Sequence, residues 1–289
     1  VLAYNTHYLG YNANMLANEM FLDSADLRSS VVSKAKQVGY TPTSSTASSA
    51  VIDVVVNNAS GASLTMSRGT KFATSINGQN YNFVNNADVT ITPDNGVYKF
   101  SNLSIFEGTY LNFKYTASTS DIDQRFIIPN DNVDTTTLTV KVQNSSSDST
   151  TNTYTLADGL TGLTPTSQVY FLQEVENGRY EVYFGDGVLG KAIADGNIVI
   201  FDYINCNQDA PNNATTFTLS GTIGGFSDAT ITTISNSTGG SVPESISSIK
   251  YNAPRDYASQ DRAVTAEDYK VLVKSLYANA QAVQVYGGE

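Results

Sequence analysis

Three Asn-Gly dipeptides each lie between short stretches rich in β-branched and aromatic residues, at Asn77-Gly78, Asn95-Gly96 and Asn177-Gly178. Both central residues of a type I′ turn need positive φ, so Asn-Gly is the strongest short-range signal of a β-hairpin. The dipeptides predict hairpins that join residues 71–76 to 81–84, 89–92 to 97–100, and 169–175 to 180–184.

Other segments have the two-residue period of strands. Residues 51–56 are a compact apolar run interrupted by a single aspartate, and apolar residues alternate with polar ones over 138–142 and 198–200. The Asn- and Ser-rich stretch 143–153 predicts an exposed hairpin tip. Short strands separated by turn residues are typical of β-sandwich or barrel-like domains.

The N-terminal part has a helical period instead. Apolar residues recur on one helical face at Leu27, Val31, Ala35 and Val38. Ser24 is the expected N-cap of this helix, and Gly39 is the expected terminator just after it. The pair Leu16 and Met20 suggests a preceding helix, and Pro42 with the polar run 43–49 predicts a linker.

A second helical pattern lies near the C-terminus. Thr265 and Asp268 have the spacing of a capping box, which predicts a helix that begins at Ala266. An apolar stripe then follows at helical spacing, formed by Tyr269, Leu272, Val273, Leu276 and Tyr277. Residues 282–286 are expected to form one closing strand.

These patterns together predict a strand-dominated α+β fold, with two β-sandwich-like domains flanked by N- and C-terminal helices. The expected divisions are a helical region at 1–48, a first β domain at 49–120, a second β domain at 121–242, and a C-terminal helix with its closing strand at 243–289. The sequence lacks an initiator Met and a signal peptide, and we interpret it as a fragment of a longer protein.

Composition excludes several classes of function. With 27 acidic and 16 basic residues the net charge is −11, which disfavours binding to nucleic acid because that requires clustered cations. One cysteine and one histidine exclude an internal disulfide and argue against multi-cysteine or histidine-based metal sites. No apolar run approaches the ~18 residues that span a bilayer. We therefore expect no cofactor, no metal and no membrane partner.

Residues 184–190 contain the spacing of a dinucleotide-binding loop, at Gly185, Gly187 and Gly190. That motif requires a following helix, whereas here a short segment and another strand follow, and Asp186 would repel a pyrophosphate. The loop is instead interpreted as a tight β-turn in which glycines supply positive φ.

Other candidates for chemistry are weaker. His7 and Cys206 have no partner residues at metal-site or catalytic spacing, so they are interpreted as a surface residue and a small residue at a strand end. The acidic pairs at 121–123 and 131–134 lack the calcium-loop pattern and are interpreted as solvated carboxylates. The 27 acidic residues leave a glycosidase-type pair open, but no spacing favours one. No catalytic residue is predicted.

Four sequence elements resemble a known family. The segment Asn252-Ala253-Pro254-Arg255, followed by Arg262-Ala263-Val264-Thr265 and by Asp268-Tyr269, is similar to a signature of the baseplate J-like family of contractile phage tails. The loop Phe184-Gly185-Asp186-Gly187, with Gly190, resembles a second element. Residues 18–25 with 38–42 resemble its helical lead-in, and 67–72 resemble a Gly-Thr-x-Phe element. The Asn- and Ser-rich character is most similar to the branch found in the wedges of T-even phages.

The resemblance implies a structural role. The chain would be a non-enzymatic oligomeric part of the virion, placed in the tail baseplate after assembly in the host cytoplasm. It would associate with itself as a homodimer and in a wider inner ring, and with other baseplate wedge proteins, and would rearrange when the sheath contracts. The motif residues would be structural, with Arg255 and Arg262 pairing with carboxylates. Leu272, Leu276 and Tyr277 are the expected self-association residues.

Two other classes of function remain open from the residues alone. Aromatic residues together with Asn and Asp suit a carbohydrate-binding or adhesin-like β module, which would bind glycans without self-association. A glycan hydrolase of a tail apparatus is the third class, and its turnover would depend on one specific carboxylate.

Overall fold

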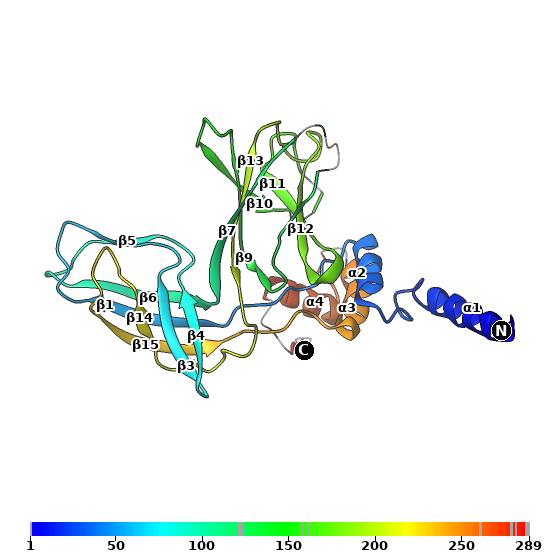
Figure 1. Ribbon diagram of the computed structural model, residues 1–289, viewed down its shortest axis with the longest axis horizontal. Coiled ribbons are helices and arrows are strands. Elements are labelled where there is room, and N and C mark those ends of the chain that lie inside the picture. Colours follow the sequence, from blue (N-terminus) through cyan, green and yellow to red (C-terminus); the bar gives the residue numbers. More distant parts are fainter. Residues whose placement is uncertain are drawn as a thin grey trace. The chain divides into compact units, whose positions relative to one another are not determined.

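The computed structural model describes residues 2–118, 120, 124–157, 159–160, 162–259, 262–277, 280 and 282–286, apart from the side chains of 274 and 275. The chain divides into two compact units (Figure 1). Unit 1 comprises Val1–Thr43, Leu172–Glu181 and Pro243–Glu289, and unit 2 comprises Ser44–Phe171 and Val182–Val242. Strands dominate and helices lie toward both ends of the sequence, which confirms the α+β class.

A six-stranded sheet of unit 2 has the order β14-β3-β4-β6-β1-β15. Its strands are β1 (Ser49–Val56), β3 (Lys71–Ile76), β4 (Gln79–Val84), β6 (Tyr98–Glu107), β14 (Thr218–Ser220) and β15 (Ala229–Thr238), and neighbours are antiparallel. The burial of β1 alternates along its length, as the period of two predicts. Its buried side chains join a core that includes Phe72, Phe83 and Phe100.

A seven-stranded sheet has the order β7-β13-β9-β10-β11-β12-β8. Its strands are β7 (Thr109–Thr116), β8 (Phe126–Ile127), β9 (Val133–Gln143), β10 (Thr151–Leu156), β11 (Val169–Glu174), β12 (Tyr180–Phe184) and β13 (Ile198–Asn205). Strand β13 does not alternate in burial as expected: its interior residues are all buried, and the strand pairs with β7 and β9 along its two edges. A small sheet pairs β2 (Leu64–Met66) with β5 (Val89–Ile91).

Two of the three predicted hairpins are confirmed. Asn77 and Gly78 have φ of 51° and 81° and join the paired strands β3 and β4. Asn177 and Gly178 also have positive φ and join β11 to β12 through the short 3₁₀ turn η1 (Glu176–Gly178).

The third predicted hairpin is wrong in its pairing. Asn95 and Gly96 do form a tight turn with φ of 50° and 80°. However, β5 pairs with β2 and not with β6, because Pro93 lacks an N–H donor and interrupts the strand before the turn.

The two polar segments behave differently. Residues 144–150 form the exposed tip that joins β9 to β10, as predicted. Residues 43–48 form no helix or strand, and the division between the two units falls between Thr43 and Ser44, as expected of a linker, but Ser44, Ser45 and Ser48 are buried. Hydrogen bonds satisfy these small hydroxyls; Ser48 Oγ, for example, lies 2.8 Å from Asn212 Oδ1. Small polar side chains can therefore be core residues where acceptors are supplied.

Unit 1 contains the helices α1 (Leu2–Asn18), α2 (Arg28–Gln37), α3 (Ile246–Ser259) and α4 (Ala266–Leu276). Helices α2 and α3 share a small core that includes Val31, Ala35, Ile249 and Ala253. Gly39 ends α2 as predicted: it has φ of 84°, and its N–H and that of Tyr40 bond the carbonyls of Lys36 and Ala35.

The predicted N-cap of α2 is wrong. Ser24 donates its hydroxyl hydrogen to the carbonyl of Asn18, and Leu27 occupies the cap position without a side-chain bond. The carboxylate of Glu19 instead accepts the N–H groups of Asp26 and Leu27, so a negative charge lies beside the start of the helix. These bonds contribute to a lowered pKa of Glu19, together with a hydrogen bond from the Ser30 side chain, the largest cause.

The capping box of α4 is confirmed, with Thr265 and Asp268 bonding each other's backbone N–H. The closing strand is wrong: residues 282–286 form no strand, and among the described strands none pairs with them.

The proposed division near Asp121 falls on undescribed residues. Each sheet contains strands from both sides of this division. Strand β7 precedes it and belongs to the seven-stranded sheet, whereas β14 and β15 follow it and belong to the six-stranded sheet.

Candidate functional site

The loop at 184–190 is a tight turn held by its own aspartate. The Asp186 carboxylate accepts the N–H groups of Val188 and Leu189, each at 2.9 Å, and these bonds lower its pKa. Gly187 N–H bonds the Gly190 carbonyl at 3.1 Å, and both glycines have φ near 90°. The loop amides that could hold a phosphate are therefore already bonded to a carboxylate.

Close packing explains the remaining loop residues. A side chain at Gly185 would place its Cβ 2.3 Å from the Leu189 carbonyl oxygen, so only glycine fits there. Phe184 packs edge-on against Tyr154 and Phe126, with ring centroids 5.3 and 5.8 Å away. The loop is a rigid closure at the end of β12, as its interpretation as a turn implies.

In unit 1, Glu244 connects two of the family elements. Its Oε1 accepts the amide of Asn252 at 2.7 Å, and the hydroxyl of Tyr40 lies 2.9 and 2.8 Å from its two carboxylate oxygens. Ser248 Oγ also donates to Oε1, at 2.6 Å. Asn252 belongs to the Asn-Ala-Pro-Arg element and Tyr40 to the helical lead-in, so two distant motifs meet at one carboxylate that sequence patterns did not single out.

An arginine extends this cluster. Arg28 makes a bidentate pair with the Glu174 carboxylate, at 2.7 and 2.9 Å, and its Nη1 bonds the Glu244 carbonyl at 2.5 Å. Both groups of this pair are charged, which strengthens the hydrogen bonds between them. Glu174 is buried, which shields the pair from water. Three separate segments of the chain, around residues 28, 174 and 244, are thereby joined within unit 1.

The rest of the Asn-Ala-Pro-Arg element serves helix packing. Ala253 is fully buried against α2, and Pro254 lies inside α3. The expected pairing of Arg255 with a carboxylate is wrong: its guanidinium lies 3.5 Å from the centroid of the Tyr251 ring and bonds the Tyr251 carbonyl. Arg255 therefore contacts the aromatic ring of Tyr251, one helical turn earlier in α3.

The second half of the signature organises the start of α4. Asp268 Oδ2 accepts the N–H groups of Thr265 and Val264, at 2.8 and 3.1 Å. These bonds and the nearby charge of Arg262 contribute to the lowered pKa of Asp268. Asp261 lies outside the described residues.

The apolar stripe of α4 is largely uncovered. Tyr269, Val273 and Tyr277 are exposed, Leu276 is 86% exposed, and Leu272 is half-buried. The residues predicted for self-association are thus at the surface of unit 1, and the loop at 184–190 lies in unit 2.

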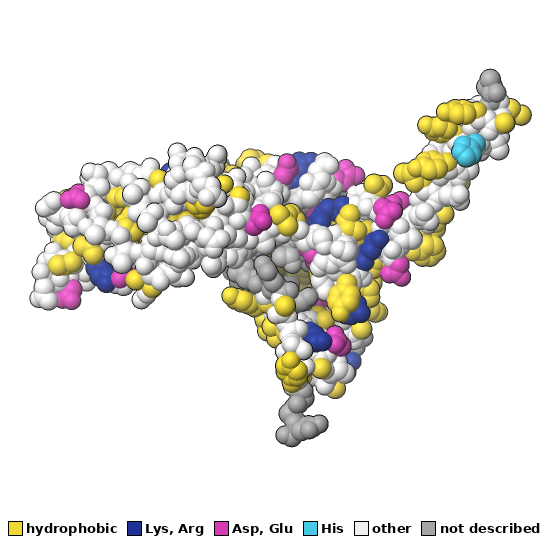
Figure 2. Space-filling model, turned by 90° about the horizontal axis from the view of Figure 1, so that it is seen from below, with side chains coloured by type: hydrophobic (Ala, Val, Ile, Leu, Met, Phe, Trp, Pro, Cys, Tyr) yellow, Lys and Arg dark blue, Asp and Glu magenta, His cyan; other side chains and the backbone are white. Residues whose placement is uncertain are grey.

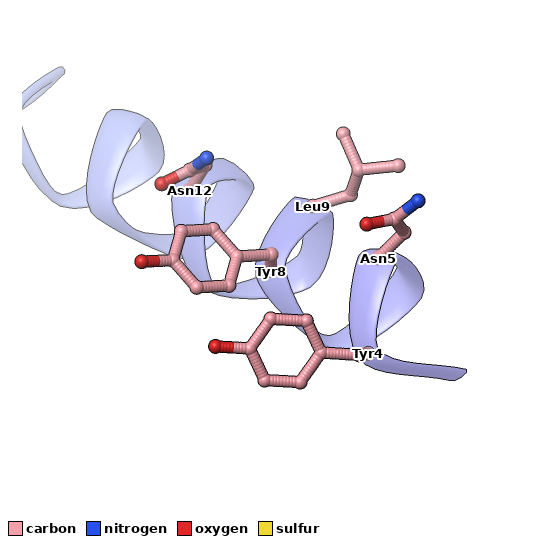
Figure 3. A pocket seen from close by; sticks show the side chains of 5 residues that line it. All are labelled: Tyr4, Asn5, Tyr8, Leu9 and Asn12. Atoms are coloured by element: carbon pink, nitrogen blue, oxygen red, sulfur yellow. The ribbon is translucent and has the colours of Figure 1, made fainter. Parts of the chain in front are cut away.

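Helix α1 is a second uncovered surface, and the apolar pair Leu16 and Met20 predicted only its C-terminal end. None of its side chains is buried, and Figure 2 shows hydrophobic side chains along it. A shallow depression is lined by Tyr4, Asn5, Tyr8, Leu9 and Asn12 (Figure 3). The sequence pattern that could have predicted this helix is formed by Tyr4, Tyr8, Tyr11 and Met15, which have the 4-3-4 spacing of a coiled-coil seam.

The Gly-Thr element lies next to a buried charge in unit 2. Arg68, directly before Gly69, donates to Asp202 at 3.0 Å. Asp202 also accepts from Lys141 and Asn112. Burial alone would raise the pKa of Asp202, but the hydrogen bonds that it accepts outweigh burial and lower the pKa.

The remaining candidates have structural explanations. His7 is exposed on α1, and Cys206 is buried, which raises its thiol pKa to about 11. Asp131 is exposed as expected, but Asp134 is buried and bonds Ala47 N–H and Thr136, so describing it as solvated was wrong. The described residues hold no cluster of three metal-ligating side chains and no helix suited to crossing a membrane.

Two comparisons identify relatives of the chain. Residues 112–215 match the family model of the third domain of bacteriophage baseplate wedge protein gp6. The chain is 29% identical over 315 residues to baseplate wedge protein gp6 of Enterobacteria phage T4. That similarity covers 99% of this chain but 46% of the relative. A domain match and similarity along almost the whole chain thus make this protein similar to phage baseplate wedge proteins, and it spans about half the length of the relative that it matches.

Proposed function

We propose that the chain is a non-enzymatic structural subunit of the virion, located in the baseplate of a contractile phage tail. It self-associates as a homodimer within a wider inner ring, contacts other wedge proteins, and changes its arrangement when the sheath contracts. The similarity to baseplate wedge protein gp6 supports the structural role, and the uncovered helices α1 and α4 support the contacts. Assembly takes place in the host cytoplasm.

The observation that carries this proposal is helix α1. It has 17 residues, contains no Asp, Glu, Lys or Arg, and buries none of its side chains. It also contains four asparagines and a glycine, which are poor helix formers. Isolated helices of about this length are marginal in water even with favourable sequences. A helix of this composition therefore requires a partner that covers its apolar residues.

Helix α4 offers a second surface with a different character. Its N-terminus is fixed by the capping box, so the exposed Tyr269, Leu276 and Tyr277 are presented on an ordered helix. Aromatic and aliphatic side chains of this kind are enriched in the buried centres of protein interfaces. We assign α4 to self-association and α1 to contacts with a second copy or with other wedge proteins.

Sedimentation velocity of the 31.0 kDa chain tests self-association, and co-expression with the other wedge proteins of the same phage tests assembly. We expect a dimer or larger species in wild type. Combining Tyr8→Glu with Leu9→Glu should abolish contacts through α1. The matched control adds the same charges on the polar side of α1, with His7→Glu and Asn14→Glu, and should leave them intact.

Two results would refute the proposal. One is a wild-type chain that stays monomeric at all concentrations and enters no complex with wedge proteins. The other is equal loss of assembly in the test and control variants, which would attribute the effect to net charge or helix stability and not to the apolar face.

A further inference from the structure

Asp202 is a buried carboxylate on β13 with three partners in its own sheet, one of them the Tyr110 hydroxyl on β7, which donates a hydrogen bond to it. Lys141 Nζ on β9 lies 2.9 Å from Oδ2, and Asn112 Nδ2 on β7 lies 2.6 Å from Oδ1. These two strands flank β13 on either side. The seven-stranded sheet therefore neutralises and hydrogen-bonds this carboxylate without help from elsewhere.

A fourth partner comes from the loop that precedes β3 of the six-stranded sheet. Arg68 Nη1 lies 3.0 Å from the same Oδ2 atom. The loop is attached to the segment after β4, because Asn85 accepts the N–H of Gly69 through its carbonyl and that of Thr70 through its side chain. Arg68 thus connects the six-stranded sheet to the seven-stranded sheet.

This connection is redundant for the buried charge. Breaking a buried ion pair is normally costly because it leaves one charge uncompensated. Here Lys141 and Asn112 remain with Asp202 when Arg68 leaves. The Arg68 side chain is already 36% exposed, so its guanidinium can pass into water. The Arg68–Asp202 pair can open at low cost to folding.

A different set of contacts holds the point where the chain passes between the sheets. The Glu107 carboxylate, at the end of β6, accepts the backbone N–H and the side-chain amide of Asn207 at 2.8 and 2.7 Å. The next residue, Gly108, has φ of 126°, and a Cβ there would lie 2.3 Å from the Asn205 carbonyl oxygen. Asp202 precedes Asn207 by five residues, roughly 16 Å along an extended chain.

We propose that the Arg68–Asp202 pair is a releasable latch that sets the angle, within unit 2, between the strands of the six-stranded sheet and the strands β7, β9 and β13, with Glu107 and Gly108 at the pivot. When the latch is closed these two groups of strands move as one body. When it opens, β7, β9 and β13 keep the buried charge paired and the six-stranded sheet turns about the pivot. This inference concerns the chain itself and stands whether or not the chain forms a ring.

Distance measurement between spin labels tests the latch in the whole chain. One label is attached at Ser75→Cys on β3 and the other at Thr153→Cys on β10, both exposed positions. Cys206 is buried and should stay unlabelled, which the chain without added cysteines verifies. In Arg68→Met we expect the distance distribution to widen roughly twofold, as for a small rigid-body rotation. The melting temperature should change by less than about 2 °C.

Lys141→Met is the matched control. It removes a cation from the same carboxylate oxygen but leaves the contact between the sheets, so the distribution should stay narrow. The wild-type chain gives an independent readout, because raising salt from about 0.1 M to about 1 M shortens the screening length from ~10 Å to ~3 Å and should widen its distribution. Arg68→Met should not respond to salt.

Three results would overturn the latch. The first is an unchanged distribution in Arg68→Met. The second is equal widening in Lys141→Met, which would mean that the sheet and not Arg68 had been disturbed. The third is a wild-type distribution that is insensitive to salt.

Discussion

Unit 2 has a large apolar core between its strands, whereas unit 1 has a small core and leaves most apolar side chains of α1 and α4 exposed. Unit 2 holds the fully buried aromatic residues, including Phe72, Phe83 and Phe201. Unit 1 has a small aliphatic core and depends instead on charged contacts around Glu244 and Arg28. From this difference we expect the apolar core of unit 2 to contribute most of the stability of the chain, and unit 1 to gain stability from a partner.

The largest expected effect is in the core of unit 2. Phe83 is fully buried and packs edge-on against Phe217 at 5.0 Å. Phe83→Ala should lower the free energy of unfolding by about 3–5 kcal/mol, measured by urea denaturation with circular dichroism. Leu276→Ala in α4, at an exposed position, should change it by less than about 0.5 kcal/mol. Similar effects for the two variants would break the comparison between the units.

Loss of the Glu244 carboxylate should have the next largest effect. Glu244→Ala leaves Tyr40 and Asn252 without their shared acceptor, which should cost about 2–3 kcal/mol. Amide hydrogen exchange in α2 and α3 should rise while the β-sheet amides of unit 2 stay protected. Glu244→Gln keeps one acceptor and should cost less. Uniform loss of protection across both units would show that they do not respond separately.

The capping box gives a smaller and more local effect. Thr265→Ala removes the side-chain acceptor for the Asp268 N–H and should cost about 1 kcal/mol. Faster amide exchange within the first turns of α4 is the measurement, and Thr265→Ser should restore the wild-type rate. An unchanged exchange rate would mean that the cap does not limit the order of α4.

The smallest expected effect is a pH dependence in unit 2. Burial raises the pKa of Glu107 above its ordinary 4.5. A raised pKa in the folded state stabilises the protein below the unfolded value, and this contribution is lost as pH rises through the folded value. The wild-type melting temperature should therefore fall, relative to Glu107→Gln, as pH increases above 4.5. If the melting temperatures of the wild type and of Glu107→Gln change in parallel with pH, burial of the Glu107 carboxyl is not the cause of the pH dependence.

Local signals in the sequence predicted local structure well. Two Asn-Gly hairpins, the terminator Gly39 and the capping box at Thr265 each depend on a few neighbouring residues, and each is found. The interpretation of 184–190 as a turn rested on the same kind of evidence, and Gly187 and Gly190 have the positive φ that it requires.

Features that depend on distant residues could not be predicted in this way. Nothing near Glu244 indicates that Tyr40 and Asn252 meet there, and nothing near Arg68 indicates Asp202. Strand β13 lacks the expected alternation, and nothing in its own residues indicates that side chains on both of its faces are buried. The interaction surfaces on α1 and α4 stay predictions, since exposure shows where a partner can bind but not which one.

The order of strands in the six-stranded sheet has a consequence for synthesis of the chain. Strand β1 lies between β6 and β15, and Val56 pairs with Ala229. At ribosomal rates of 5–20 residues per second, roughly 10–35 s separate the emergence of these two partners. Throughout that interval one side of β1 has no backbone partner from its own sheet. A growing chain therefore exposes an apolar strand edge, and crowding of nascent chains on a polysome should favour pairing between neighbours and aggregation.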